Sequence, residues 1–129
     1  MTLLEILFLY LAFRAKQVLC DFFFQPSWIA IGKCKSFKEG GLKPLLIHVS
    51  IHAFSTLIIM MFFAPNFWWL AIVDFFAHFI IDKIKAVVTY KMDWTAKNNP
   101  YWWAFGIDQE AHNITHLVFI IVIVMYSAV

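Results

Sequence analysis

The sequence predicts an all-α protein, a polytopic four-helix bundle in a membrane, from its composition, its apolar stretches and its spacing of polar residues. Hydrophobic residues make up 63% of the 129 residues, and charged residues only 14%. Soluble domains are about 45–50% apolar and about 25% charged. A soluble core of this size cannot enclose so many apolar side chains, because surface is a large fraction of a small domain. We therefore expect one integral membrane domain over residues 1–129.

Four stretches are apolar and long enough for membrane-spanning helices, which need about 20 residues. We expect them at residues 2–24, 44–64, 66–91 and 102–129. Pro26 and Pro65 follow the first two stretches and end them. Pro44 stands at the start of the second stretch, where a missing backbone N–H costs little. Polar connections at residues 33–43 and 92–101 complete the pattern of a helical bundle.

The lysines beyond residue 30 predict the orientation of this bundle. They gather in and beside two of the connections, as Lys33, Lys35, Lys38, Lys43, Lys83, Lys85, Lys91 and Lys97. By the positive-inside rule, these two connections face the cytoplasm. We therefore expect a multi-pass protein of the inner (plasma) membrane with both termini outward. The polar residues of all four helices then fall at one depth, in the cytoplasmic half of the bundle.

Histidine and aspartate recur four residues apart on three of the expected helices. Residues at this spacing share one helix face, roughly 5–6 Å apart, where two such side chains can hold one metal ion. The candidate metal ligands are His48, His52, His78, Asp82, Asp108 and His112. They suit a divalent ion, with Zn as first choice and Mn or Fe as alternatives. Asp74 and His116 extend the pairs by one turn, as ligands or as orienting partners.

Two further acidic residues on the expected helices are candidates for proton transfer. We assign this catalytic role to Asp21 or Glu110. Asp21 could equally ligate the ion, or pair with Lys85 or Lys83. Two alternatives to a metal site remain open: a buried network of hydrogen bonds and ion pairs that joins the helices, and a relay for protons or ions.

These residues lead to two hypotheses about function. The first is a metal-dependent hydrolase in the membrane, in which a divalent ion activates water toward an ester, amide or phosphoester. A lipid or lipid-linked substrate would enter from the cytoplasmic side. The second is a non-enzymatic ion or proton pathway, or an accessory membrane subunit with a structural site. The expected partners are the lipid bilayer and a membrane complex or homo-oligomer, and the net charge of +2 is too small to indicate nucleic acid.

The order of these polar motifs resembles domain-of-unknown-function family 3307 (DUF3307), a family of small bacterial and phage membrane proteins. The matching patterns are D-F-x-x-Q, H-x-x-x-H, H-F-x-x-D-x-x-K and D-Q-x-x-H, at residues 21–25, 48–52, 78–85 and 108–112. Members often carry a histidine shortly before the first pattern, where this chain has residues Lys16 to Cys20. The resemblance implies a four-helix membrane protein without a settled activity. The arrangement of polar motifs is also similar to that of families called membrane-bound metal-dependent hydrolases.

Overall fold

The computed structural model describes residues 1–127, which are all helical or in connections, with no strand in that range. The long helices are α1 (Leu3–Val18), α3 (Leu42–Phe63), α4 (Leu70–Lys91) and α5 (Asn99–Ser127). Short elements join them: the π-helix η1 (Leu19–Phe23), α2 (Ser27–Gly32) and the 3₁₀ helices η2 (Phe37–Glu39) and η3 (Pro65–Phe67). The all-α class is thus confirmed. The last two residues of the expected fourth helix and of the expected domain, Ala128 and Val129, lie outside the described residues.

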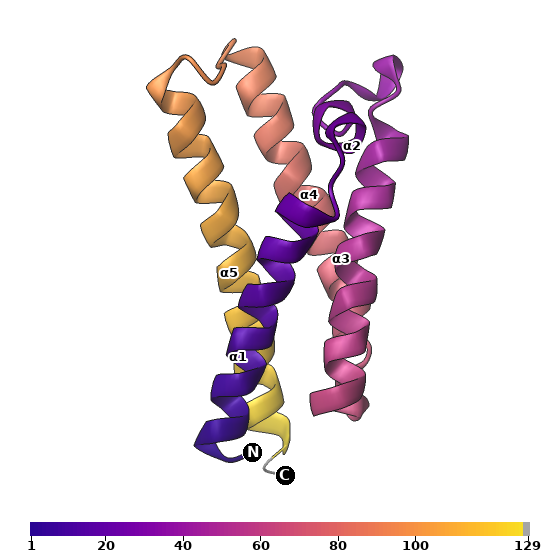
Figure 1. The fold of residues 1–129 in the computed structure, drawn as a ribbon, viewed down its shortest axis with the longest axis vertical. Helices are drawn as coiled ribbons and strands as arrows, with labels where there is room; N and C mark the ends of the chain where they lie inside the picture. Colours follow the sequence, from indigo (N-terminus) through magenta and orange to yellow (C-terminus); the bar gives the residue numbers. More distant parts are fainter. Residues whose placement is uncertain (128–129) are drawn as a thin grey trace.

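The long helices form an antiparallel bundle in which α1 and α4 each pack against both α3 and α5 (Figure 1). The start of α1 and the end of α5 lie together at one end, which we call the terminal end. The connections from α1 to α3 and from α4 to α5 lie at the other, the loop end. There α4 and α5 splay apart, and α2 crosses the bundle beside α3.

The helix boundaries follow local sequence signals. Thr2 and Glu5 form a capping box at the start of α1, so two backbone N–H groups that lack helical partners are satisfied. The non-helical backbone of Ala64 (φ −154°, ψ 70°), followed by Pro65, ends α3. Helix α5 begins at Asn99 rather than near residue 102, because Pro100 fits the first turn of a helix, where no N–H is needed.

The interior of the terminal end is apolar. All four long helices supply buried side chains to it, and we call this set the apolar cluster: Leu9, Phe13, Met60, Ala64, Leu70, Phe119, Ile120 and Ile123. Close packing of such side chains holds the helices together through many weak contacts. The polar residues of the same helices lie nearer the loop end, so the bundle is divided along its length.

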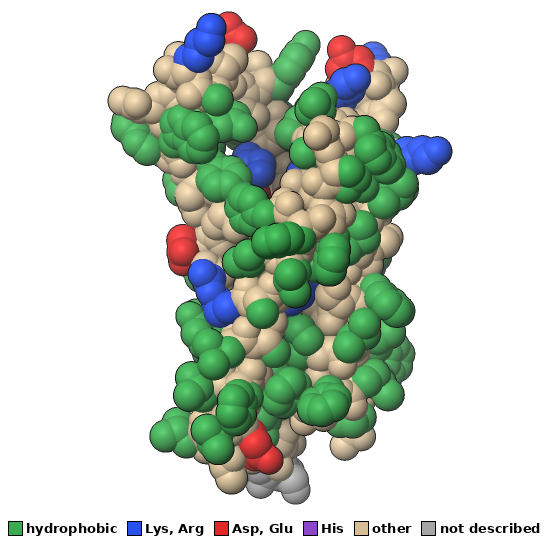
Figure 2. All heavy atoms as spheres, viewed as in Figure 1, with side chains coloured by type: hydrophobic (Ala, Val, Ile, Leu, Met, Phe, Trp, Pro, Cys, Tyr) green, Lys and Arg blue, Asp and Glu red, His purple; other side chains and the backbone are tan. Residues whose placement is uncertain are grey.

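Large apolar side chains also cover the outside of the bundle, as Figure 2 shows for one face. Phe62 on α3 is 85% exposed, and Ile107 on α5 is 71% exposed. Among residues 1–127, two helices, α3 and α5, are long and apolar enough to cross a membrane. Helix α4 is as long as α3 but carries five charged residues, from Asp74 to Lys91.

Candidate metal centre

The interior on the loop side of the apolar cluster is filled with ionisable groups. Eleven of them are at most 9% exposed: Lys16, Lys33, Asp21, Asp74, Asp82, Asp108 and all five histidines. Such groups are costly inside an apolar bundle unless they pair with one another or serve a function. They come from all the long helices, from η1 and from the residue after α2. This set is therefore the main candidate for a functional site.

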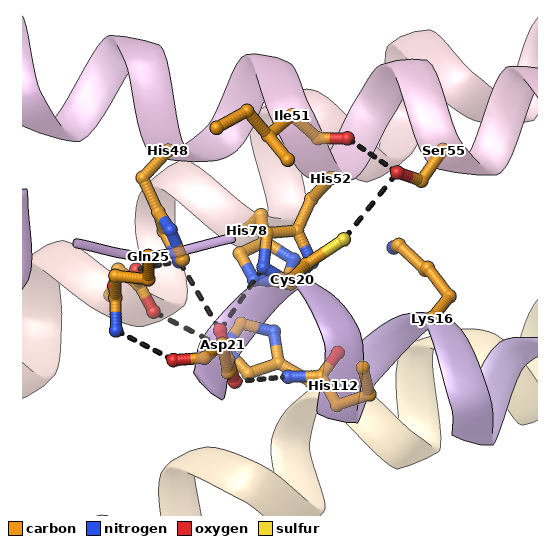
Figure 3. Close-up of polar contacts among 12 residues, drawn as sticks. Lys16, Cys20, Asp21, Gln25, His48, Ile51, His52, Ser55, His78 and His112 are labelled. Atoms are coloured by element: carbon orange, nitrogen blue, oxygen red, sulfur yellow. Dashed lines mark hydrogen bonds and ion pairs between the residues drawn. The ribbon is translucent and has the colours of Figure 1, made fainter. Parts of the chain in front are cut away.

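One group of possible ligands, which we call the Asp21 group, consists of Asp21, His48, His52 and His78. Each offers one ligand atom, and these atoms lie within 4.8 Å of one another. Oδ1 of Asp21 is 3.0 Å from Nε2 of His52 and 3.3 Å from Nε2 of His48. Figure 3 shows these side chains gathered around the Asp21 carboxylate. Three imidazoles and one carboxylate match the four ligands of a tetrahedral zinc site.

The π-helix η1 carries Asp21 into this group. Such wider turns occur mostly as single turns, frequently at functional sites. The second carboxylate oxygen of Asp21, Oδ2, accepts hydrogen bonds from the side-chain amides of Gln17, at 2.6 Å, and Gln109, at 2.8 Å. Beside it, Cys20 contacts the Ser55 hydroxyl at 3.4 Å (Figure 3). The two amide hydrogen bonds orient the carboxylate so that its other oxygen, Oδ1, faces the histidines.

A second group of possible ligands, which we call the Asp82 group, consists of His78, Asp82 and His112. Nε2 of His112 lies 3.2 Å from Oδ1 of Asp82 and 3.7 Å from Oδ1 of Asp108. The other oxygen of Asp82, Oδ2, accepts a 2.8 Å hydrogen bond from the Lys33 ammonium, which also lies 3.0 Å from Nε2 of His48. A lysine thus already occupies one side of this group.

His78 belongs to both groups and lies between them. Its ring stacks on that of His112 and lies tilted by 31° against that of His52, with centroids 3.7 Å away on each side. Neither ring nitrogen has a hydrogen-bond partner among the described residues, and the nearest carboxylate oxygen, on Asp74, is 3.9 Å from Nδ1. Buried polar atoms are nearly always hydrogen-bonded, so this imidazole calls for an explanation. A metal ion would supply the missing partner.

Three lysines neutralise three of the four buried aspartates. Lys16 pairs with Asp74 at 2.5 Å, Lys33 with Asp82 at 2.8 Å, and Lys85 with Asp108 at 2.9 Å. Asp21 is the exception, because no Lys or Arg within residues 1–127 lies within ion-pair distance of it. The pairing of Asp21 with Lys85 or Lys83 that the sequence left open is therefore not formed. The Asp21 carboxylate itself is thus without an ammonium partner among the described residues, although Lys33 contacts His48 of the same group.

The residues expected to extend the pairs form a cluster of their own around Lys16. Its ammonium lies 3.1 Å from Nε2 of His116, and the Thr56 hydroxyl donates a 2.7 Å hydrogen bond to Asp74. His116 also stacks on Phe13 of the apolar cluster. Asp74 and His116 thus have a lysine where a metal ion would otherwise lie, which fits an orienting role better than a ligand role.

The structure brings five of the six predicted ligands together: His48, His52, His78, Asp82 and His112. The sixth, Asp108, lies at the edge and pairs with Lys85. Asp21, expected to transfer protons, lies among the ligands instead. Glu110 lies apart, because its side chain is exposed and accepts a hydrogen bond from Asn113.

Sequence reasoning missed four members of the site: Lys16, Lys33, Gln17 and Gln109. Lys16 gave the clearest signal, since a charged residue in an apolar helix indicates a buried partner. Lys33 gave none, because it follows a short helix and reaches Asp82 only through its long side chain.

Fold and cluster together define a class: a helical bundle with a buried histidine and aspartate centre of the metal-ligand type. The family model described as "Protein of unknown function (DUF3307)" matches residues 7–129. The chain therefore belongs to this family, and the resemblance seen in the sequence is confirmed. Comparisons with curated proteins and with solved structures find no match.

Proposed function

We propose that all four long helices cross the inner (plasma) membrane, with the loop end in the cytoplasm and both termini outward. The exposed apolar side chains support this proposal, since soluble proteins rarely expose contiguous apolar surface of this extent. The shared location of the two basic connections also supports it, because both must lie on one side of the bilayer. The two acidic residues of α4, Asp74 and Asp82, point inward and are at most 4% exposed.

The cysteines allow a direct test of this orientation. Cys34 lies at the loop end and is exposed, whereas Cys20 is buried. A membrane-impermeant thiol reagent applied to intact cells should leave Cys34 unlabelled, and should label it after the cells are opened. The Cys34→Ser variant controls for labelling of Cys20. Labelling of Cys34 in intact cells would reverse the proposed orientation.

We propose that the chain binds a divalent metal ion in the Asp21 group, with Zn as first choice and Mn or Fe as alternatives. The observation that carries this proposal is the His78 imidazole, which is 1% exposed and has no hydrogen-bond partner within residues 1–127 on either nitrogen. The charge of Asp21 supports it further, since a buried carboxylate without an ammonium partner is the position where a cation gains most. His48 and His52 complete a set of four ligands.

The chemistry that we propose for this centre is hydrolysis of a lipid or a lipid-linked substrate. A bound divalent ion would supply Lewis-acid assistance for cleaving an ester or phosphoester. Gln17 and Gln109 fix the Asp21 carboxylate, while the contact between His112 and Asp82 offers a group that can accept and return a proton beside the ion. Glu110, the other candidate for proton transfer, would have to act from the exposed side of α5.

The apolar cluster favours a closed reaction site over a pathway through the membrane. It fills the interior at the terminal end with side chains such as Phe13 and Ile123, which offer no polar route to the other side. An ion or proton pathway would need such a route. Access to the site would be from the loop end, where a pocket has Asp21 in its wall.

The three lysine pairs favour a different function, in which the polar interior is structural. Lys16, Lys33 and Lys85 neutralise three aspartates without any metal. Polar residues that join membrane helices in this way would suit an accessory subunit of a membrane complex or homo-oligomer. The content of metal in the purified protein separates the two functions.

The experiment compares metal content across three forms of the detergent-purified chain. Wild type should retain stoichiometric metal, and His78→Ala should lose most of it, because both ligand groups share this imidazole. His116→Ala is the matched control, since this buried histidine contacts Lys16 rather than the ligand groups. Wild type without metal, or equal metal in the two variants, would favour the structural network.

A further inference from the structure

A polar pocket of about 230 Å³ at the loop end leads to the Asp21 group. It lies between η1, α2, α4 and α5, and Asp21 forms part of its wall. Lys33, Lys85 and Gln25 also line it, with the hydroxyls of Thr89 and Tyr101. Figure 2 shows a basic side chain inside the hollow on this side of the molecule. The pocket therefore offers hydrogen-bond donors next to the proposed metal centre.

Lys33 and Lys85 have ammonium protons that no group in the described part of the chain accepts. An ammonium group has three donors. Lys85 donates one hydrogen bond, to Asp108, and Lys33 contacts Asp82 and His48. Three of the six N–H groups thus remain for a ligand. A cluster of ammonium donors binds an oxyanion with several acceptor oxygens, such as a phosphate group.

An apolar groove of about 430 Å³ adjoins this pocket on the outside of the bundle, between α4 and α5. Its walls include Ile84, Trp103 and Ala104. The groove and the polar pocket share two wall residues, Lys85 and Asp108, so this ion pair lies at the border between them. A molecule at the border can place a charged part on one side and a hydrocarbon part on the other.

We propose that this double site binds a phosphate-bearing lipid, with its phosphate between Lys33 and Lys85 and its hydrocarbon chain between α4 and α5. The proposal names the substrate class of the proposed metal centre, and in that respect it rests on the proposed function. A metal ion that takes Nε2 of His48 would also release Lys33 from its contact with this histidine. The exposed apolar surface explains entry of the lipid from the side, because the groove opens where the bilayer would lie.

The test measures binding of three soluble probes to the detergent-purified full chain by calorimetry, with and without added Zn. The probes are dihexanoyl phosphatidic acid, dihexanoyl phosphatidylcholine and inorganic phosphate. Wild type should bind the phosphatidic acid about tenfold more tightly than either of the others, which is the scale of one charge-assisted hydrogen bond or of two buried methylene groups.

Two variants and two matched controls locate the binding. Lys85→Met should abolish the preference for phosphatidic acid over phosphatidylcholine. Lys83→Met should keep it, because Lys83 is a half-buried lysine of the same helix that lies over Phe37 and outside both pockets. Ala104→Trp fills the groove and should weaken the binding of phosphatidic acid about tenfold. The binding of inorganic phosphate should not change. Ala53 lines a different depression, between α3 and α4, so the control variant Ala53→Trp should change the binding of neither probe. Ala104→Trp retains every charge, so it decides the case if Lys85→Met does not fold.

Equal affinity of wild type for the two lipids would overturn the proposal, as would inorganic phosphate binding as tightly as phosphatidic acid. The proposal would also fail if Lys85→Met bound the probes as Lys83→Met does, or if Ala104→Trp bound them as Ala53→Trp does. Metal content is measured on the same samples and is scored separately. Protein without metal would refute the metal centre, while the comparison of probes would still decide whether this site binds a phosphate-bearing lipid.

Discussion

The two halves of this bundle are built from the same helices but have opposite interiors. At the terminal end, α1 contributes Leu9 and Phe13, and α5 contributes Phe119 and Ile123, all at most 2% exposed. One or two turns further along, histidine, aspartate and lysine side chains fill much of the interior, beside apolar ones such as Leu45 and Val49. Both halves are equally buried, so burial alone does not distinguish them.

The difference shows what each half contributes. Apolar side chains pack the terminal end without any cost of removing charge from water or lipid headgroups. In the polar half, burial of each ionisable group costs desolvation free energy, and only close pairing between opposite charges offsets this cost. Helices of this kind can pack without such groups, as the terminal end demonstrates. A polar half with an unpartnered histidine at its centre is therefore best explained by a function.

The largest expected effect on stability comes from breaking one ion pair in the polar half. Lys16→Met leaves Asp74 buried without its cation and should lower the free energy of unfolding by roughly 3–5 kcal/mol. Adding Asp74→Leu should restore most of that loss, because both charges are then gone. Unfolding in detergent measures both. A double variant as unstable as the single one would show that this pair does more than neutralise charge.

A smaller loss is expected from the apolar half. Ile123→Ala removes fully buried packing and should cost about 2 kcal/mol, at the low end for such changes, because lipid solvates apolar side chains in the unfolded state. Its metal content should equal that of wild type, since the apolar cluster contributes no ligand. Loss of metal in Ile123→Ala at full folding would mean that the two halves are not independent.

The sequence predicted most of the fold and much of the candidate site, because both depend on helical spacing. The prolines and apolar runs placed four long helices, and the four-residue spacing put His48 beside His52 and His78 beside Asp82. The predicted start of α5, near residue 102, is too late, because Pro100 belongs to the first helical turn rather than to the connection.

What the sequence did not predict depends on contacts between segments far apart in the chain. The π-helix turns Asp21 toward His52, a change of direction that ordinary helical spacing does not encode. Lys33 reaches Asp82 across 49 positions of sequence, and Gln109 reaches Asp21 across 88. Long flexible side chains like these carry no pattern in the sequence, so their partners become visible only in three dimensions.

The most direct test of the central claim is the effect of metal on the melting temperature of the detergent-solubilised chain. A metal ion that binds only the folded state raises the melting temperature with its occupancy. We predict that a strong chelator lowers the melting temperature of wild type and that added Zn or Mn restores it. Asp21→Asn should largely lose this response, whereas Asp74→Asn should retain it, because Asp74 pairs with Lys16 instead. A wild-type melting temperature unmoved by chelator and by added metal, in protein shown to contain no metal, would contradict the account.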